Sequence, residues 1–176
     1  MSDQLVIPRG ALVVLIGAAG VGKTTFAARH FPREAVLSSD AFRAAVGAGE
    51  ADQSATRPAF AALHRALEDR LARGLTTVVD ATNVSPGARA ALLTRARRYR
   101  TSVVAIVLDL PPNVALARNA ARPDRVVPEG AVRRQLRALV RSDDQTLGRE
   151  GFALIARLRS AAAVGAFRVV QSRENS

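Results

Sequence analysis

One stretch constrains the fold more than any other: an apolar, β-branched run that passes directly into a glycine-rich loop. The run covers residues 11–16, and the loop reads Gly-Ala-Ala-Gly-Val-Gly-Lys-Thr from Gly17 to Thr24. This spacing fits G-x-x-x-x-G-K-[ST], the pattern of a phosphate-binding P-loop between a strand and a helix. The sequence therefore predicts a buried strand over 11–16 and a helix over 24–31 that ends at Pro32.

The residue types in this loop suit a nucleoside triphosphate. Glycines let consecutive backbone N–H groups turn towards the anion, and the following helix presents its N-terminal end to the same charge. Lys23 is expected to reach the β- and γ-phosphates, and Thr24 is expected to hold Mg²⁺. The residues expected around the nucleotide are Gly17, Ala18, Ala19, Gly20, Val21, Gly22, Lys23, Thr24 and Thr25.

Two alternatives to a nucleotide site are weaker. A glycine-rich turn could merely join a strand to a helix, but a chance match to the whole pattern is expected in roughly one chain in a thousand of this composition. A secretory signal does not fit, because Gly20, Gly22 and Lys23 interrupt the apolar stretch and Asp3 lies where a signal keeps positive charge.

Lys23 is the only lysine among the 26 basic residues of the chain. A general preference for arginine explains the other positions but not this one. A compact, flexible ammonium fits inside a loop that wraps phosphate, where a planar guanidinium is too wide. The composition thus indicates that position 23 needs lysine for a geometric reason.

The length and the absence of cysteine limit the class of protein. A chain of 176 residues is the usual size of one domain, and without cysteine it has neither disulfides nor thiolate chemistry. The longest apolar stretch is far shorter than the ~20 residues that a membrane helix needs. We therefore expect one cytoplasmic domain over residues 1–176 with no membrane attachment.

The net charge of +11 is unevenly distributed. Residues 86–141 contain twelve arginines and three acidic residues, so nine of the eleven net positive charges lie there. This favours an anionic partner, although solvated helices in an arginine-rich proteome would give the same count. Aromatic residues make up 4% of the chain, so contacts with backbone phosphates are expected rather than a platform for several bases.

A second apolar run, residues 35–37, leads through two serines into Asp40 and reads as a strand followed by a helix over 40–46. The carboxyl ends of parallel strands face the ligand in sheets of this kind. Asp40 and Arg43 lie three residues apart and share one face of that helix. Spacing alone leaves open whether Asp40 acts on a ligand or only caps the helix.

The next helix is expected to follow a mobile loop over 47–57, with Pro58 in its first turn and Gly74 at its end. Its predicted core stripe is Phe60, Leu63, Leu67 and Leu71. His64 lies beside the stripe and is expected to be a packed or surface residue.

Residues 76–80 predict a buried strand that ends in Asp80. A strand-end aspartate commonly organises Mg²⁺ or its water shell in P-loop proteins, although it could also cap a turn. Thr24 and Asp80 are therefore the predicted metal ligands. Residue 81 is Ala, so the acidic pair of a P-loop motor ATPase is absent.

The second half of the chain predicts further strands and helices in alternation. The expected helices cover 86–100, 112–122 and 128–141, and the expected strands cover 103–108, 152–158 and 167–170. Residues 142–149 read as a polar stretch, and residues 1–10 as a short lead-in. The inward-facing residues of the helix over 128–141 are predicted to be Val132, Leu136, Leu139 and Val140.

Three arginines lie around the break at Pro123, namely Arg118, Arg122 and Arg125. With a P-loop in the same chain, they favour a helical lid over about 112–141 that places positive charge on a transferring phosphoryl group. Solvated arginines would have the same spacing. The alternation of strands and helices predicts an α/β fold, a doubly wound parallel sheet of the P-loop kinase type with a helical lid.

Four segments together resemble one family. They are residues 17–24, residues 38–43 (Ser-Ser-Asp-Ala-Phe-Arg), residues 78–83 (Val-Val-Asp-Ala-Thr-Asn) and residues 118–125 (Arg-Asn-Ala-Ala-Arg-Pro-Asp-Arg). They look like the kinase module of bacterial 5′-hydroxyl polynucleotide kinases, especially that of RNA end-healing-and-sealing proteins. Many families share the P-loop, whereas Ser-Ser-Asp-x-x-Arg combined with this lid is more specific.

The resemblance implies a kinase that uses ATP or another NTP, with Mg²⁺, to phosphorylate the 5′-hydroxyl end of RNA or DNA. It implies that Asp40 accepts the proton of the attacking hydroxyl and that Arg43 grips a phosphate of the acceptor strand. Arg118 and Arg122, with Arg125 as a third, correspond to lid arginines that contact the donor phosphates. The catalytic set implied by the resemblance is Lys23, Asp40, Arg43, Arg118 and Arg122.

Two other functions stay open. Such relatives carry phosphatase and ligase domains after the kinase, so this chain is either an excised domain or a free-standing kinase, whose acceptor could then be a small molecule. A nucleotide-gated RNA-binding protein without transfer activity is the third reading, which Asp40 disfavours because a pure binder gains nothing from a carboxylate beside phosphate. RNA or DNA as acceptor, the preferred NTP and pairing as a homodimer stay undecided.

Overall fold

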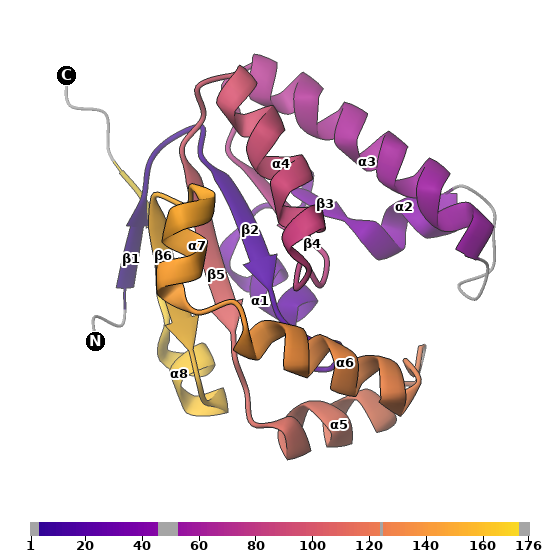
Figure 1. The fold of residues 1–176 in the computed structure, drawn as a ribbon. Helices are drawn as coiled ribbons and strands as arrows, with labels where there is room; N and C mark the ends of the chain where they lie inside the picture. Colours follow the sequence, from indigo (N-terminus) through magenta and orange to yellow (C-terminus); the bar gives the residue numbers. More distant parts are fainter. Residues whose placement is uncertain (1–3, 46–52, 124, 173–176) are drawn as a thin grey trace.

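A sheet of five parallel strands lies at the centre of the chain, of which the computed structural model describes residues 4–45, 53–123 and 125–172. The strands are β2 (Leu12–Ile16), β3 (Val36–Ser38), β4 (Thr77–Asp80), β5 (Val103–Leu108) and β6 (Leu154–Leu158). Their order in the sheet is β3-β4-β2-β5-β6, so β2 is central, with β4 and β3 on one side of it and β5 and β6 on the other (Figure 1). The predicted doubly wound parallel sheet is therefore confirmed.

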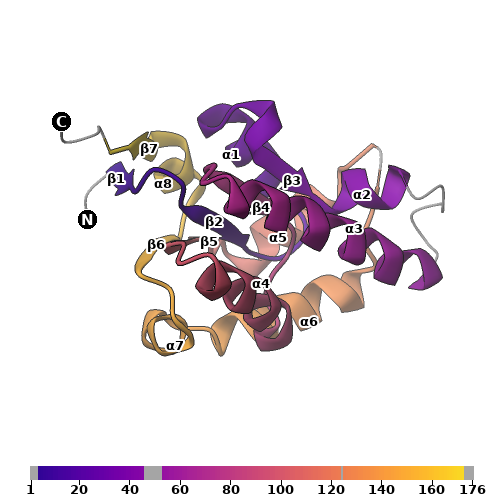
Figure 2. The same cartoon turned by 90° about the horizontal axis from the view of Figure 1, so that it is seen from above.

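Helices cover both faces of this sheet (Figure 2). The helices on one face are α1 (Lys23–His30) and α8 (Ala161–Ala166), and those on the other are α3 (Gln53–Ala72), α4 (Pro86–Arg98) and α7 (Asp144–Glu150). Neighbouring residues of β2 such as Val13 and Val14 point to opposite faces and pack into separate apolar clusters. A strand covered on both faces must be apolar throughout, as β2 and β5 are.

A second, two-stranded sheet joins the two ends of the described chain. β1 (Gln4–Ile7) pairs in parallel with β7 (Arg168–Gln171), and Ile7 is fully buried. The sequence predicted only a short lead-in before residue 11. That prediction is wrong, because a four-residue strand carries little periodic signal of its own and this one pairs with residues more than 160 positions away.

The start of α3 also differs from the prediction. The helix begins at Gln53, so Pro58 lies inside it rather than in its first turn. The loop predicted over 47–57 is therefore wrong for 53–57, and residues 47–52 lie outside the described part of the chain. Proline has no N–H, so Pro58 costs α3 one backbone hydrogen bond, but the helix continues through it. Within the described residues, no helix combines the length and the apolar character that crossing a membrane requires.

The stretch predicted as polar, residues 142–149, contains α7. The Asp143 carboxylate caps its start by accepting a hydrogen bond from the Thr146 N–H at 2.7 Å, and Gly151 ends it in the left-handed region at φ 119°. A seven-residue helix that buries Leu147 and is otherwise largely polar lacks the apolar periodicity that the prediction relied on.

Two predicted core residues are not in the core. Leu63, Leu67 and Leu71 are buried as expected, but Phe60 is half-buried, because this part of α3 borders a cleft rather than the sheet. Val140 is 81% exposed. It is the last residue of α6 (Glu129–Val140) and lies about 100° around the helix from the buried Leu139, so both cannot face inwards.

Helices α5 (Pro112–Ala120) and α6, here called the lid helices, lie beyond the carboxyl ends of β2 and β5 (Figure 1). The segment between them is held by Asn119, which is 3% exposed. Its amide Nδ2 donates to the Val127 carbonyl at 2.7 Å, and its Oδ1 accepts from the Val127 N–H at 3.1 Å. These two hydrogen bonds hold the turn between the lid helices, where the sequence predicted a break at Pro123.

A fully buried arginine braces the turn after β4. Arg89 Nη1 donates to the carbonyls of Asn83 and Val84 at 3.1 and 2.8 Å, and two nitrogens of its guanidinium bind both carboxylate oxygens of Glu150 at 2.7 Å. Asn83, also buried and at φ 49°, donates from Nδ2 to the Leu15 carbonyl at 2.8 Å. These bonds hold the ends of β2 and β4 together, next to the loop that follows β2.

Candidate active site

A cleft of about 900 Å³ opens at the carboxyl end of the sheet. Its walls come from the loop after β2, from α1, from α2 (Ser39–Ala45), from the end of β4, and from the lid helices with the segment between them; α3 and α8 also contribute residues. The predicted site residues that line it are Ala19, Gly20, Val21, Gly22, Lys23, Thr24, Thr25, Asp40, Arg43, Asp80, Arg118, Arg122 and Arg125. Gly17 and Ala18, the first two residues of the loop, are buried. The chain thus brings residues from four separate segments to one cavity.

The P-loop has the backbone geometry of an anion cradle. Gly20 and Gly22 adopt φ angles of 85° and 93°, a region that glycine enters without strain. Gly22 precedes α1 directly, so the N-terminal end of that helix faces the loop. Gly20 also lies so close to α5 that a Cβ there would come within 2.4 Å of the Ala115 carbonyl oxygen.

Lys23 lies inside the loop and is almost fully buried. Its Nζ donates to the carbonyl oxygens of Gly17 at 2.9 Å and Ala18 at 2.8 Å. Burial lowers the pKa of Lys23 to about 8, against the charges of Asp80 and Asp40, which raise it. A bound phosphate would supply the negative charge that this buried ammonium lacks.

Thr24 and Asp80 lie together at the other side of the loop. Thr24 Oγ1 donates to Asp80 Oδ2 at 2.7 Å, and burial raises the pKa of the Asp80 carboxyl above its ordinary value despite that hydrogen bond and the charge of Lys23. Hydroxyl and carboxylate oxygens are the ligands that Mg²⁺ prefers, and Mg²⁺ is usually held by one or two such groups with phosphate and water. The pair fits that ion, and the described residues contain no group of three or more His, Cys, Asp or Glu that would form an all-protein metal site.

Asp40 projects into the cleft from the first turn of α2, which confirms its predicted place after a strand. Its Oδ1 accepts hydrogen bonds from Arg43 Nη2 and from Arg125 Nη1. Partial burial raises the pKa of Asp40, but the hydrogen bond from Arg43 and the charges of Arg125, Arg43 and Arg122 together lower it below the ordinary value. The carboxylate is therefore ionised at neutral pH.

The other lid arginines lie nearer the P-loop. A Cβ at Gly22 would lie 3.9 Å from Arg118 Nη1, so this guanidinium sits over the start of α1. The charge of Arg122 acts on Lys23, Asp40 and Asp80 alike, lowering the pKa of all three. Arg125 was expected to contact the donor phosphates with them, but in this structure it binds Asp40.

One contact in the cleft was not anticipated from the sequence. The side chain of Gln135 on α6 accepts a hydrogen bond from the Ala19 N–H of the P-loop at 2.8 Å. Gln135 lies three residues after Val132 and four before Leu139, so it shares a helix face with these two buried residues. A polar residue on an otherwise apolar face is the sequence signal that could have indicated this contact. It links α6 directly to the P-loop backbone.

Comparison with protein families gives one match over most of the chain. The family AAA_33, described as an AAA domain, matches residues 12–142. No curated protein matches the sequence. The matched range runs from β2 through the lid helices and so contains every site residue that the sequence predicted.

Several solved structures share the fold. A chain of the Pnkp1/Rnl/Hen1 RNA repair complex is 20% identical with a TM-score of 0.66; the match covers 82% of this chain but 47% of that one. A gluconokinase from Sinorhizobium meliloti 1021 is 17% identical with a TM-score of 0.54, covering 91% and 93% of the two chains. A shikimate kinase from Acinetobacter baumannii is 20% identical with a TM-score of 0.52, covering 88% and 87%. At these identities the likeness establishes the P-loop kinase fold and leaves the acceptor open.

Proposed function

This chain belongs to the AAA_33 family of AAA domains, and we propose that it is a kinase that transfers the γ-phosphoryl group of ATP, or of another NTP, to the 5′-hydroxyl end of RNA or DNA. One observation carries the proposal. The Asp40 carboxylate, held by Arg43 and Arg125, lies in the same cleft as Lys23 of the P-loop. A site that only bound a nucleotide would be weakened by a carboxylate facing its phosphates.

The P-loop would hold the donor nucleotide. Its backbone N–H groups and the N-terminal end of α1 favour the β- and γ-phosphates, and Lys23 adds a full positive charge. Thr24 and Asp80 would hold Mg²⁺, which when bound neutralises part of the phosphate charge. Because a phosphate favours the charged form of a neighbouring lysine, binding would raise the pKa of Lys23.

Asp40 would act on the acceptor. As an ionised carboxylate it can take the proton of the 5′-hydroxyl while that oxygen forms its bond to the γ-phosphorus. The bond from the γ-phosphorus to the β–γ bridging oxygen breaks in the same step, and the nucleoside diphosphate leaves with the electron pair. A low pKa makes Asp40 a weak base, which suffices because a loose phosphoryl transition state demands little covalent help.

Positive charge from two directions would stabilise the transferring group. Lys23 approaches it from the P-loop, Arg118 from α5, and Arg122 from the segment that follows α5. The negative charge of the transition state is spread over the equatorial oxygens of the phosphoryl group, so several fixed cations act on it better than one. Arg43, beside Asp40, would bind a phosphate of the acceptor next to the attacking hydroxyl.

Phosphorylation of a small hydroxyl compound is the second candidate. The fold is shared with a gluconokinase and a shikimate kinase as well as with the RNA repair chain, of whose length this chain spans about half. The same Asp40 and P-loop would phosphorylate any hydroxyl that the cleft admits. The arginine three residues after Asp40, which suits an acceptor with a phosphate near its hydroxyl, supports the polynucleotide.

A transfer assay separates these candidates. The purified chain is incubated with γ-labelled ATP, Mg²⁺ and one of three acceptors: a 5′-hydroxyl oligonucleotide, a nucleoside 3′-phosphate, or a panel of sugar acids and other small alcohols. Lys23→Ala, which removes the P-loop cation, controls for contaminating kinases. Label in the oligonucleotide supports the proposal, label confined to a small alcohol supports the second candidate, and tight ATP binding with no labelled acceptor supports a nucleotide-gated binding protein.

A further inference from the structure

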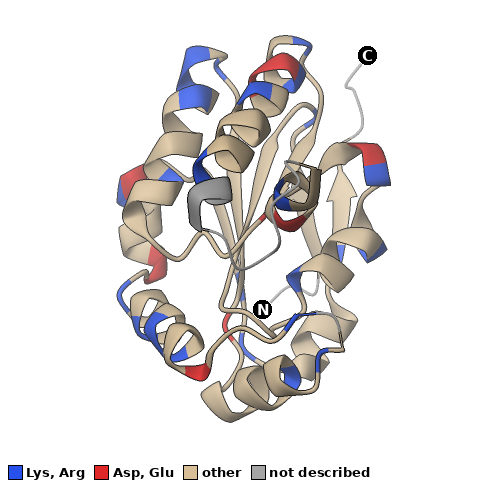
Figure 3. Cartoon of the chain, turned by 90° about the vertical axis from the view of Figure 1, so that its right-hand side faces the viewer, with Lys and Arg blue, Asp and Glu red and all other residues tan. Residues whose placement is uncertain are grey.

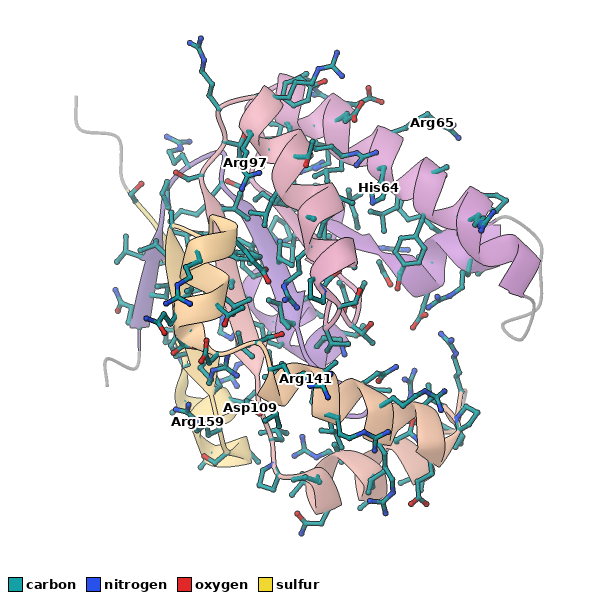
Figure 4. All side chains as sticks on the ribbon, viewed as in Figure 1. His64, Arg65, Arg97, Asp109, Arg141 and Arg159 are labelled. Atoms are coloured by element: carbon teal, nitrogen blue, oxygen red, sulfur yellow. The ribbon has the colours of Figure 1, made fainter. Side chains whose placement is uncertain are left out.

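A second groove runs along α3, beside the active-site cleft. It has a volume of about 490 Å³, and the residues used here from its lining are Arg57, Phe60, His64, Arg65, Glu68 and Arg95. The first five lie at i, i+3, i+7, i+8 and i+11 and so share one side of α3, and Arg95 faces them from α4. Figure 4 labels His64 and Arg65 on this helix. None of these residues was assigned a role in the nucleotide site.

The groove adjoins the side of the cleft that carries Asp40 and Arg43. Phe60 lines both cavities, and α3 packs against α2, the helix that carries Asp40 and Arg43. No residue of the P-loop or of the lid helices lines the groove within the described part of the chain. A ligand that left the cleft past Phe60 would therefore leave from beside the hydroxyl acceptor and not from the nucleotide.

The charges in the groove suit an anion. Its carboxylate, Glu68, is already paired with Arg95, whose Nε lies 3.1 Å from Glu68 Oε1. Arg57 and Arg65 are exposed, and the structure gives neither an ion pair with a described residue. Basic residues are spread widely over the helices (Figure 3), and Arg57 and Arg65 are two that line this groove. Two exposed guanidinium groups without an ion pair to a described residue favour two phosphates.

The groove also presents two aromatic rings. The ring centroids of Phe60 and His64 lie 6.2 Å apart at an interplanar angle of 50°. Burial, and then the charge of Arg95, lower the pKa of His64, against the charge of Glu68, so the imidazole is neutral at pH 7. Neutral rings beside phosphate-binding arginines suit unpaired bases, whose faces are free to stack, better than a duplex, whose faces are not.

We propose that this groove binds the single-stranded segment that follows the 5′-terminal nucleotide of the acceptor, with Arg57 and Arg65 on its phosphates and Phe60 and His64 against its bases. The inference rests on the proposed polynucleotide kinase activity and narrows its acceptor to a single strand. A small acceptor would end in the cleft and leave the groove empty. The groove is thus where the two candidate functions differ in structure.

The test compares two acceptors and two double variants by steady-state kinetics. The acceptors are a 5′-hydroxyl single strand of about 12 nucleotides and a nucleoside 3′-phosphate, which is too short to reach the groove. Arg57→Ala/Arg65→Ala removes the groove cations, and Arg73→Ala/Arg149→Ala removes the same charge from exposed positions that line neither cavity. KM, kcat and the salt dependence of KM are measured for each pair.

We expect the groove variant to raise KM for the long strand about tenfold or more, with kcat unchanged, and to leave KM for the nucleoside 3′-phosphate unchanged. The slope of log KM against log salt should fall by about 1.4, since each lost single-strand phosphate contact accounts for about 0.7. The control variant should match the unmodified chain on both acceptors.

Three outcomes would overturn the inference while leaving the kinase proposal intact. They are equal effects of the groove variant on both acceptors, no effect on either, and a blunt duplex accepted as well as the single strand. Failure of the unmodified chain to label any 5′-hydroxyl end would instead remove the proposed function itself. The two failures are therefore distinguishable in one set of assays.

Discussion

The P-loop side of the cleft, where we propose that the nucleotide binds, is built from backbone, whereas the Asp40 side, proposed to bind the acceptor, is built from side chains. The P-loop runs without interruption from Gly17 to Thr24, and its shape depends on glycine φ angles and on the start of α1. On the acceptor side, the Asp40 carboxylate of α2 meets Arg125, which is 85 residues further along the chain. Arg43 reaches the same oxygen from the next helical turn.

The two sides therefore differ in how far a single substitution can change what they bind. A backbone cradle recognises any polyphosphate and tolerates changes in neighbouring side chains, so one P-loop serves many acceptors. The acceptor side changes with single substitutions in α2, α3 or the lid helices, none of which alters the strand order of the sheet. We therefore expect acceptor specificity to depend on residues that are far apart in the sequence and come together only in the folded chain.

The largest effect should come from the nucleotide side. Lys23→Ala should lower kcat by roughly three orders of magnitude, because the charge that faces the phosphates is lost. Lys23→Arg should not restore activity, since Nζ sits between two carbonyl oxygens at 2.9 and 2.8 Å, inside a buried loop too narrow for a guanidinium. Kinetics of both variants check this, with circular dichroism to show that they fold. An arginine variant with most of the activity would refute the geometric account of the single lysine.

On the acceptor side, Asp40→Asn should lower kcat by about two orders of magnitude while ATP affinity changes little. The amide keeps the shape of the carboxylate but cannot take the proton of the hydroxyl. Single-turnover kinetics and ATP titration measure the two effects separately, and Asp69→Asn, an exposed change on α3, is the matched control. If transfer survives in Asp40→Asn, the carboxylate only positions its two arginines.

The sequence predicted best what contiguous residues determine. The strand over 103–108 is confirmed residue for residue, and the helix from Pro86 starts at its Ser85 cap, whose side chain accepts from the Ala88 N–H at 3.2 Å. The five-stranded parallel sheet follows from such local signals. The roles assigned to the site residues stay predictions, although the structure brings most of them to one cleft.

What the sequence missed depends on pairs distant along the chain. β1 pairs with β7, at the other end of the described chain, and Gln135 accepts a hydrogen bond from Ala19, 116 residues before it. The contact of Arg125 with Asp40 needs the turn that Asn119 fixes. Local sequence patterns do not predict such long-range contacts, because these contacts depend on how distant elements pack in the folded chain.

A matched pair of glycines tests how the P-loop and the lid helices fit together. Gly20→Ala should lower the free energy of unfolding by about 2–4 kcal/mol, because φ is 85° and the new Cβ would meet backbone atoms of α5 at 2.4 and 2.8 Å. Gly148→Ala, in α7 with nothing within 4 Å of its Cβ, should raise it by about 0.4–1 kcal/mol. Denaturant unfolding measures both, and equal effects would contradict the close approach of α5.

The pH dependence of ATP binding should follow Lys23. Its pKa is about 8 in the free protein and would be higher beside phosphate, so binding takes up a proton above pH 8. Affinity should therefore be level below pH 8 and fall by up to about tenfold per pH unit above it. Titration calorimetry from pH 7 to 9.5 tests this, and Lys23→Ala should bind weakly with a level profile. A level profile in the unmodified chain would mean that the ammonium stays charged without nucleotide.

The smallest effect concerns the link from α6 to the P-loop. Gln135→Ala removes the acceptor of the Ala19 N–H and should lower the free energy of unfolding by about 0.5–1.5 kcal/mol, whereas Gln145→Ala, exposed in the first turn of α7, should change it little. Hydrogen exchange locates the loss: amides of the lid helices should exchange faster, while those of β2 and β5, buried on both faces, should not change. Faster exchange in the central strands would mean that the glutamine supports the whole fold. Unchanged exchange in the lid helices would mean that α6 is held by its apolar face alone, and the two sides of the cleft would then be coupled through Asp40 and Arg125 rather than through the P-loop.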